Sequence, residues 1–358
     1  MRVLLLAAVV ALAAGAPTKA VGVRIAVDPR IELFSILCRL AGHPEYGRAS
    51  TPYARAVDAH FAPFANHPAV RSTRGLRARW GIAHDAPISL AVHLDDSFAP
   101  VRPLAPAPSD LDARWREAPL DGYLAEVRAF ARESGFLTFF DEQARIRGLV
   151  EDRYRAIVGD HRVIQWFDRT FGKRPRASYL VAPGLLTGPN AYGARAARAD
   201  GGEDVVQVVM LEDPDADGVP RLSEVTLEVL VHELAHNYVN PMLDGHANQL
   251  RASAEPVFRS VEAAMNAQKY GTPEIMVNES VVRALTILFL RDAGAQTHAL
   301  RSLAKQQELS FLWTPELADG LDRARRRAGG KLTPPALVAT THTVLAAWAQ
   351  KAARPTRP

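Results

Sequence analysis

The sequence predicts an α+β fold in which a small mixed sheet lies next to one long apolar helix and precedes a mostly helical C-terminal part. Two β-rich runs, 177–181 and 205–211, come directly before a stretch at 224–240 whose apolar residues repeat at helical spacing. Beyond Pro241, amphipathic helical periodicity continues to Lys351. With 358 residues, of which 48% are hydrophobic, the chain is long enough to bury one substantial core.

The chain opens with the pattern of a secretory signal peptide. Arg2 is followed by an apolar run from Val3 to Ala14 and then by small residues. We therefore expect residues 1–20 to be a signal peptide and the mature protein to be secreted or periplasmic, without stable insertion in a membrane. An uncleaved anchor or a buried first helix is the alternative interpretation.

Residues 21–358 are predicted to form a single domain, with sheet and helices in its part 21–240 and helices alone in its part 241–358. Four prolines between Ala99 and Ser109 indicate a surface loop rather than a linker between domains. The predicted elements are strands at 21–27 and 88–94, helices at 31–41, 53–64, 111–117, 120–134 and 139–171, a loop at 183–202, and helices at 252–269 and 275–291 before three further helices.

The formal net charge of +4 is modest, and the positive residues are mostly scattered arginines. Because no stripe of basic and aromatic residues is present in the sequence, we do not expect a nucleic-acid partner.

The long apolar helix carries His232, Glu233 and His236, which form an H-E-x-x-H signature. Residues four apart stack on one helix face, so the two imidazoles face one point. Two neutral imidazoles suit Zn²⁺, whose catalytic sites take three protein ligands and leave one position for water. Glu233 can then act on that water as general base. The alternative is a buried helix with two core histidines, but polar side chains on an apolar helix need partners.

A third ligand is expected from a later helix. One large class of zinc peptidases extends the signature with Gly and His, and this chain instead has Val239 and Met242. Glu279, preceded by Asn278, lies on a largely apolar helix where an unpaired carboxylate would be costly, and we predict that it completes a His₂Glu site. The other candidates are Glu255, Glu262, Glu274 and His246.

Hydrolysis also needs a hydrogen-bond donor for the oxyanion that develops in the transition state. Tyr192, in the loop beside the presumed edge strand, is the first candidate for this catalytic role. Arg283 lies one turn after Glu279 and can instead orient the ligands. The remaining candidates are His93, Tyr238, His246 and Arg283 itself.

An acidic loop precedes the long helix and has the spacing of an EF-hand calcium loop, D-x-D-x-D-G-x5-E. Its possible Ca²⁺ ligands are Asp213, Asp215, Asp217 and Glu224. Pro220 stands where an aliphatic residue is usual, and the run before the loop reads as a strand rather than a helix. A solvated acidic turn that favours a helix N-terminus explains the pattern without calcium.

Several segments together resemble the bacterial family called domain of unknown function 4932, which is assigned to the zincin-like metallopeptidases. The resembling segments, spread over about residues 28 to 300, are Ile31–Ile36 with Arg39–Ala41 and Tyr46, Ala91–Leu94, Asn190–Gly193, His232–His236 with Val239–Pro241, and Asn278–Glu279. The resemblance implies a gluzincin-type catalytic domain with a zinc site and a zincin-like fold, but no settled substrate. Arg283 departs from the thermolysin-like pattern, in which an Asp at this position supports a zinc-binding His.

We therefore expect an exported zinc-dependent hydrolase, and first of all a metallopeptidase that cleaves a peptide or protein substrate. In this interpretation His232, His236 and Glu279 hold Zn²⁺ and Glu233 is the general base. The alternatives are a catalytically inactive zincin-like zinc-binding protein and a structural envelope protein. An amide in a cell-wall peptide remains open as the bond cleaved, and so does the oligomeric state.

Overall fold

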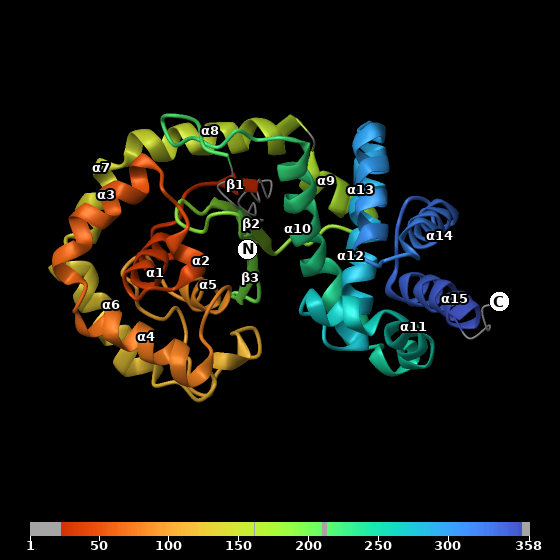
Figure 1. Ribbon diagram of the computed structural model, residues 1–358, viewed down its shortest axis with the longest axis horizontal. Helices are drawn as coiled ribbons and strands as arrows, with labels where there is room; N and C mark the ends of the chain where they lie inside the picture. Colours follow the sequence, from red (N-terminus) through yellow and green to blue (C-terminus); the bar gives the residue numbers. More distant parts are fainter. Residues whose placement is uncertain (1–22, 161, 210–212, 353–358) are drawn as a thin grey trace, which may run out of the picture.

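The structure is a computed structural model that describes residues 23–160, 162–209 and 213–352. The predicted signal peptide, residues 1–20, lies outside the described residues. Within them, no helix combines the length and the apolar character needed to cross a membrane. Figure 1 shows an N-terminal part in which helices curve around the small sheet, and a C-terminal part made of helices.

Four strands form one mixed sheet in the order β1-β2-β4-β3. The strands β1 (Val23–Ile25), β2 (Ala177–Pro183) and β4 (Glu203–Val209) pair in parallel. The strand β3 (Tyr192–Ala197) pairs antiparallel with β4 and forms an edge of the sheet. A small mixed sheet among many helices confirms the predicted α+β class.

The helices of the N-terminal part enclose α1, whose apolar side chains are almost entirely buried. Figure 1 shows α3, α4, α6, α7 and α8 as an arc around α1 and α2. Proline stands in the first turn of α1, α2, α3 and α4, where its fixed φ suits a helix and its missing N–H costs nothing. The helices of this part are α1 (Pro29–Leu40), α2 (Pro44–Gly47), α3 (Pro52–Phe61), η1 (Ala62–Phe64), α4 (Pro68–Trp80), α5 (Ala86–Ala91), η2 (Ala113–Trp115), α6 (Leu120–Glu133), α7 (Phe136–Glu142), α8 (Ala144–Asp160) and α9 (Val163–Phe171).

The helices of the C-terminal part pack around α12, which is buried over nearly its whole length. It contacts α10, α11, α13 and α14. The prediction that the described residues after 241 form helices and no strands is confirmed. The helices of this part are α10 (Glu224–Asp244), α11 (Ala247–Ala267), α12 (Pro273–Asp292), α13 (Gln296–Glu308), α14 (Thr314–Arg327) and α15 (Pro334–Ala352).

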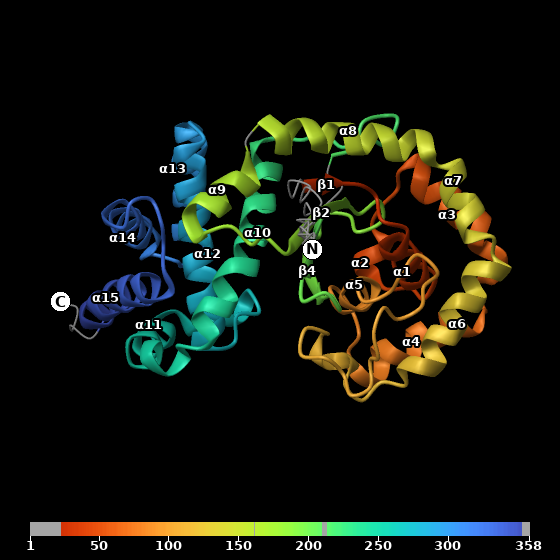
Figure 2. The same ribbon diagram turned by 180° about the vertical axis from the view of Figure 1, so that it is seen from behind.

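The helix α10 joins the two parts, because it packs on β3 and β4 with one side and on α12 with another. Seen from behind, α9 crosses α10 (Figure 2). There the ring of Phe167 stacks on that of Tyr238 at 4.8 Å between centroids. The prediction that residues 21–358 form a single domain stays a prediction. The sheet and the C-terminal helices both pack on α10.

The predicted strand at 88–94 is wrong, because this segment forms α5 and a following turn. The alternation of apolar residues suggested a half-buried strand. In the structure Ala86, Ile88, Leu90 and Ala91 are all fully buried. The spacing of apolar residues therefore does not mark a buried and an exposed face, and it cannot distinguish a strand from a helix here. Pro87 in the first turn favours the helix.

The helix predicted at 224–240, for which the sequence suggests a stop at Pro241, is longer in the structure, since α10 continues to Asp244 with the proline inside it. A proline leaves the carbonyl four residues earlier without its helical donor. Here that carbonyl belongs to Asn237, and it accepts a hydrogen bond from Arg174 Nη1 at 3.5 Å. A contact distant in sequence therefore replaces the lost bond.

Three further boundaries differ from the prediction. The segment 139–171 is divided into α7, α8 and α9, with Arg162 in the left-handed region between the last two. The predicted loop at 183–202 contains the strand β3, so Tyr192 begins a strand rather than lying in a loop. The predicted helix at 111–117 is only the short turn η2. These errors arise where the run of regularly spaced apolar residues is short, or where the spacing continues across the end of one helix into the next.

Candidate functional site

The helix α10 presents His232 and His236 to one point. Ser223 caps its first turn together with Thr226, and the two histidines stand one turn apart on one side. Their Nε2 atoms are 3.3 Å apart, and their ring planes cross at 78°. Both side chains are about one-fifth exposed, at 20% and 22%, and can therefore be reached from outside.

The helix α12 brings Glu279 to the same point. Its Oε1 lies 3.2 Å from Nε2 of His236, and its Oε2 lies 3.6 Å from Nε2 of His232. Among the described residues, these three side chains are the one group of three or more His, Cys, Asp or Glu whose ligand atoms gather closely enough for a metal ion. The structure thus brings together the three residues that the sequence singled out as zinc ligands.

The donor set fits a zinc ion in chemistry and in spacing. Bonds of 2.0–2.1 Å at the tetrahedral angle place neighbouring ligand atoms about 3.3 Å apart. Here the two Nε2 atoms are 3.3 Å apart, and each lies near one carboxylate oxygen of Glu279, His236 at 3.2 Å from Oε1 and His232 at 3.6 Å from Oε2. Oε2 of Glu279 is buried and pairs with Arg283 at 3.1 Å, but it accepts no hydrogen bond of normal geometry among the described residues, so it can take a further positive partner.

The electrostatics of two of the three candidate ligands, His232 and Glu279, favour the protonation states that a metal needs. Burial lowers the pKa of His232 to about 3, which keeps its imidazole neutral. Burial alone would raise the pKa of Glu279, but His236, His232 and Arg283 outweigh it and lower that pKa to about 2. For His236 the hydrogen bond to Glu279 outweighs burial and raises the pKa. An anionic carboxylate beside a neutral imidazole is the form that coordinates zinc.

Two neighbours hold the ligands in place. Oδ1 of Asn240 lies 3.2 Å from Nδ1 of His236, so it accepts the Nδ1 proton and leaves Nε2 free to bind a metal. Nη2 of Arg283 lies 3.1 Å from Oε2 of Glu279 and donates to the hydroxyl of Tyr270 at 3.0 Å. Arg283 therefore contacts the carboxylate of a candidate ligand rather than a histidine, and its role in orienting that ligand stays a prediction.

Glu233 opens onto a cavity of about 500 Å³ beside the three candidate ligands. Burial in this recess raises the pKa of Glu233 to about 7. The cavity is bounded by α10, by the edge strand β3, by α5, and by the segment 109–116. Its lining residues include Asp85, Ser89, Asp110, Asp112, Arg116, Gly193, Arg195, Glu233, His236, Asn237 and Asn240.

The edge strand offers unpaired main-chain groups to this cavity. The N–H of Arg198 points inward and donates to Gly202, whereas the N–H of Ala197 points outward and donates to Oδ2 of Asp110 at 2.6 Å. Main-chain groups alternate in direction along an antiparallel strand. The N–H and C=O groups of Gly193 and Arg195 therefore face outward, where an extended peptide can pair with them.

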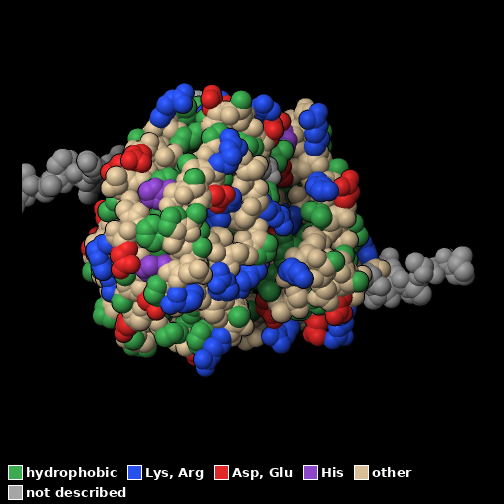
Figure 3. Space-filling view, turned by 60° about the vertical axis from the view of Figure 1, so that its left-hand side comes forward, with side chains coloured by type: hydrophobic (Ala, Val, Ile, Leu, Met, Phe, Trp, Pro, Cys, Tyr) green, Lys and Arg blue, Asp and Glu red, His purple; other side chains and the backbone are tan. Residues whose placement is uncertain are grey.

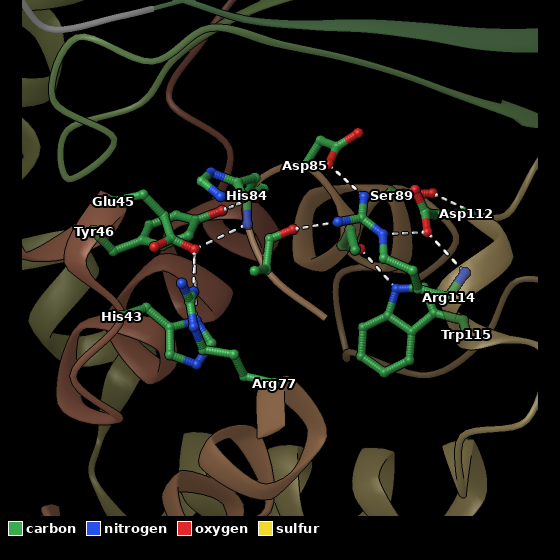
Figure 4. Close-up of polar contacts among 12 residues, drawn as sticks. His43, Glu45, Tyr46, Arg77, His84, Asp85, Ser89, Asp112, Arg114 and Trp115 are labelled. Atoms are coloured by element: carbon green, nitrogen blue, oxygen red, sulfur yellow. Dashed lines mark hydrogen bonds and ion pairs between the residues drawn. The ribbon is translucent and has the colours of Figure 1, made fainter. Parts of the chain in front are cut away.

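The wall opposite α10 is held rigidly by Arg114, which Figure 4 shows between Asp85 and Asp112. Both carboxylates accept from its guanidinium. The N–H of Asp112 donates to the hydroxyl of Ser89 at 3.0 Å, and the indole of Trp115 donates to the backbone of α5 at 2.7 Å. This network ties α5 to the segment that carries η2, and together they form one wall of the cavity.

A second network fixes the turn before α5 (Figure 4). His84 has a positive φ of 55°, which is unusual for a residue other than glycine. Its N–H donates to Oε1 of Glu45 at 3.0 Å, and its carbonyl accepts from the hydroxyl of Tyr46 at 2.5 Å. Arg77 also donates to Glu45. These bonds stabilise a backbone conformation that would otherwise be costly.

Tyr192 lies at the wall of the cavity, and its catalytic role stays a prediction. Its ring lies 6.4 Å from that of Tyr46, on the strand face opposite to Gly193, and its buried hydroxyl has no hydrogen-bond partner in the described part of the chain. Burial raises the pKa of this hydroxyl. The contacts found for the ring lead towards α2 rather than towards the three candidate ligands.

The other predicted donors are engaged elsewhere. The hydroxyl of Tyr238 lies 2.6 Å from that of Tyr179, on the side of α10 that packs on α9. Nδ1 of His93 lies 2.7 Å from the carbonyl of Ser89, and His246 contacts the carbonyl of Met242 beyond the last turn of the signature. None of these contacts involves Glu233 or the three candidate ligands.

The alternative third ligands lie apart from the two histidines. Glu255 pairs with Arg259 on the surface of α11, and Glu274 pairs with Arg251. Glu262 is exposed on α11. Their positions leave Glu279 as the carboxylate that meets His232 and His236 in the structure.

The acidic loop does not gather its carboxylates at one point. Asp213 lies 3.4 Å from Arg221 and Asp215 lies 2.8 Å from Arg153, while Glu224 lies 3.4 Å from His298 on α13. Asp215 also accepts from the backbone N–H groups of residues 217 and 219. Calcium binding by Asp213, Asp215, Asp217 and Glu224 stays a prediction.

Sequence reasoning did not assign a role to Asn240, Asp110 or Arg195. Asn240 stands four residues after His236, so helical spacing could have identified it as a support for that ring. Asp110 and Arg195 line the cavity from segments that are distant from α10 in the chain, and no local sequence pattern predicts this position for them.

One family model matches the chain, over residues 23–328, and its description is Domain of unknown function (DUF4932). No curated protein and no solved structure was found to match the chain.

Proposed function

The chain belongs to the DUF4932 family, and from the geometry of its site we propose that it is a zinc-dependent metallopeptidase. The observation that carries the proposal is the meeting of His232, His236 and Glu279, with Glu233 beside them at a cavity bordered by an unpaired strand edge. The signature alone gives two ligands and a base. The carboxylate from α12 supplies the third ligand that a catalytic zinc site requires.

The side chains divide the work of hydrolysis among them. His232, His236 and Glu279 would hold the metal, and bound Zn²⁺ supplies a Lewis acid that polarises a carbonyl and acidifies water. Glu233 takes the proton of the attacking water and passes it to the leaving amine. A pKa near neutrality, which burial gives Glu233, suits a group that must both accept and release a proton.

The strand edge supports a peptide as the substrate class. An extended peptide laid along β3 would form main-chain hydrogen bonds with Gly193 and Arg195 and would pass Glu233 at the start of the strand. Such pairing recognises the main chain of the substrate rather than one of its side chains. It therefore suits a substrate that is a peptide. A cell-wall peptide would offer the same main-chain groups.

We extend the proposal to the fold and the location. A signature helix below an antiparallel edge strand, with a glutamate ligand from a later helix, supports a zincin-like fold of the gluzincin type. Export of the mature chain rests on the sequence of residues 1–20 alone and is proposed on that basis.

Glu233→Gln tests the assignment of the base. The amide keeps the shape of the side chain but cannot take a proton, so hydrolysis of a peptide mixture should fall by roughly 100-fold or more. Zinc content should stay at the wild-type level, because Glu233 is not a ligand in this account. Both quantities are measured on the same preparations, by peptide mass spectrometry and by elemental analysis.

Glu262→Gln is the matched control, since it makes the same chemical change on the exposed surface of α11. It should leave hydrolysis and zinc unchanged. Undiminished turnover in Glu233→Gln would show that another group is the base. Zinc bound by a wild type that cleaves nothing would favour an inactive zinc-binding protein.

A further inference from the structure

A second cavity of about 510 Å³ adjoins the candidate metal centre on the side away from the first. It lies between the N-terminal half of α10 and the helix α13. His232 and Glu233 border it, so the two cavities meet at the proposed base. Its lining residues are Val225, Glu228, Val229, His232, Glu233, Arg283, His298, Arg301, Ser302, Lys305 and Gln306.

The direction of β3 assigns this cavity to one side of the cleaved bond. A Cβ on Gly193 would lie 3.8 Å from Nδ2 of Asn237 and 4.0 Å from the carbonyl oxygen of Glu233, whereas Arg195 lines a further pocket together with Pro241 and Met242 of the last turns of α10. The strand therefore runs towards the C-terminal end of α10. An antiparallel peptide, the more stable pairing, runs the opposite way. It passes Arg195, then Gly193 and Glu233, and continues into the second cavity with the residues that follow the cleaved bond.

The charges of the second cavity are mainly positive. Arg301 and Lys305 stand one turn apart on the exposed side of α13. The one acid that lines the cavity besides Glu233 is Glu228, and its carboxylate is already engaged. His298 Nε2 lies 2.7 Å from it, and the hydroxyl of Ser302 donates to it. Figure 3 shows one face of the molecule, which is hollowed and carries Lys and Arg side chains together with Asp and Glu side chains.

The first cavity differs, because its lining is mixed in charge. Arg116 and Arg195 face it together with Asp85, Asp110 and Asp112. A strong preference for one sign of charge is therefore expected only on the side that follows the cleaved bond. This contrast gives the inference an internal control.

We propose that the second cavity binds a carboxylate on the residue after the cleaved bond, with Arg301 and Lys305 as the groups that select it. This inference rests on the proposed function and names its substrate class: peptides with Asp or Glu at that position, or with a free C-terminus there. Arg301 has no acidic partner among the described ion pairs, so its guanidinium is available to a substrate. Lys305 lies 3.1 Å from Glu308 in an ion pair whose two side chains are both exposed, so this pair can exchange for a substrate carboxylate. Val225 and Val229 line the cavity near α10 and would contact the aliphatic part of the bound residue.

The first experiment profiles cleavage by the zinc-loaded protein. A peptide library varied on both sides of the cleaved bond is digested and sequenced by mass spectrometry, with free and amidated C-termini in separate pools. We expect Asp and Glu to exceed Asn and Gln after the bond by about fivefold, the upper range for partly exposed ion pairs. A preference confined to the free-acid pool assigns the carboxylate to the C-terminus instead.

Charge reversal identifies the residues. The double variant Arg301→Glu and Lys305→Glu should lose the acidic preference and favour Lys or Arg after the bond, with the profile before the bond unchanged. Both side chains are exposed on α13, so the fold and the zinc content should be kept. The control is Arg323→Glu, an exposed arginine of α14 that lines neither cavity and should change nothing.

A binding measurement separates failure of this inference from failure of the proposed function. Hydroxamates that chelate zinc, with an Asp, Asn or Lys side chain after the chelating group, are titrated into zinc-loaded protein by calorimetry. Tightest binding of the Asp compound, lost in the double variant, supports the cavity even for a protein that cleaves nothing. Equal affinity for the three compounds, or cleavage without an acidic preference, overturns the inference and leaves the peptidase proposal standing.

Discussion

Arg283 is the residue that most distinguishes this site. Its guanidinium reaches Oε2 of Glu279, donates to Gln306 and lies over the ring of Phe311 at 4.4 Å. A cation beside a ligand carboxylate keeps that carboxylate ionised and fixes its rotamer. It also adds positive charge next to the proposed metal, which suits a site that binds an anionic substrate group.

Glu279→Ala tests the third ligand. Removing one of three ligands should lower zinc occupancy well below the wild-type level, because two imidazoles alone bind zinc weakly. Zinc per chain is measured after dialysis against a weak chelator. Glu274→Ala, on the exposed first turn of the same helix, is the control and should keep its zinc. Equal occupancy in the two variants would move the third ligand to another residue.

Glu32 is a second buried carboxylate, distant from the metal centre, and it predicts how stability depends on pH. Its side chain is fully buried, Oε1 accepts from the N–H of Leu185 at 3.0 Å, and Oε2 accepts from the hydroxyl of Tyr53 at 2.9 Å. Burial outweighs these bonds and raises its pKa from 4.5 to about 7. The folded protein therefore keeps a proton that the unfolded chain releases above its ordinary pKa.

This difference makes the folded state lose stability as pH rises between about 4.5 and 7. Each pKa unit corresponds to 1.36 kcal/mol, so the contribution of Glu32 is on the order of 3 kcal/mol. Glu32→Gln, which mimics the protonated form, should remove the part of this decline that is due to Glu32, while the contribution of Glu233, whose pKa is also raised to about 7, stays. Denaturant unfolding at pH 5 and pH 8 measures it for both proteins. A wild type and a variant with the same pH profile would contradict the account.

At the residue scale, sequence reasoning works where the chemistry is local. His232, Glu233 and His236 stand within five positions, and helical spacing alone brings them together. Glu279 could be predicted because a carboxylate on an apolar helix needs a partner. Asp110 could not, because its contact with Ala197 joins segments that no sequence pattern relates.

At the scale of elements, the site depends on how α10 and β3 are placed against each other. The strand begins over Glu233, and its outward main-chain groups border the first cavity. Asp110 already occupies the outward N–H of Ala197, which leaves Gly193 and Arg195 for a peptide. The strand edge and the base thus lie at the same end of the cavity.

Gly193→Pro tests the role of this edge. Proline removes the outward N–H, which takes no part in pairing with β4, so the sheet and the zinc content should be kept. Peptide cleavage should fall by about tenfold, because one main-chain hydrogen bond to the substrate is lost. The specificity constant, kcat/KM, is the quantity to measure.

Gly193→Ala is the control for the added bulk. A Cβ at this position would meet its nearest neighbours at 3.5 to 4.0 Å, which is ordinary contact, and the N–H remains. It should cleave like the wild type. A proline variant with full activity would exclude pairing of the substrate at Gly193.

Elements with a clear period could be predicted, and those defined by tertiary contacts could not. The helices α11 and α12 follow from their amphipathic or apolar patterns, as do the strands β2 and β4. The apolar alternation at 88–94 predicts a strand, but the segment forms α5, whose apolar side chains are all buried. The continuation of α10 past Pro241 depends on Arg174, a residue of the segment between α9 and β2.

At the scale of the whole molecule, the two parts of the chain share the work. The N-terminal part supplies β3 and the rigid wall of α5 and η2, and the C-terminal part supplies the three candidate ligands and the basic face of α13. A peptide would lie across both, with the metal at the point where they meet. The sequence predicted the α+β class, but the enclosure of α1 by an arc of helices depends on contacts between distant segments.

The most direct test of the central claim is the zinc content of the purified mature protein, measured by elemental mass spectrometry for the wild type and for His236→Ala. The account predicts about one zinc per wild-type chain and a marked loss in the variant. A wild-type protein without zinc, even after reconstitution, would contradict it and return α10 to the role of a core helix.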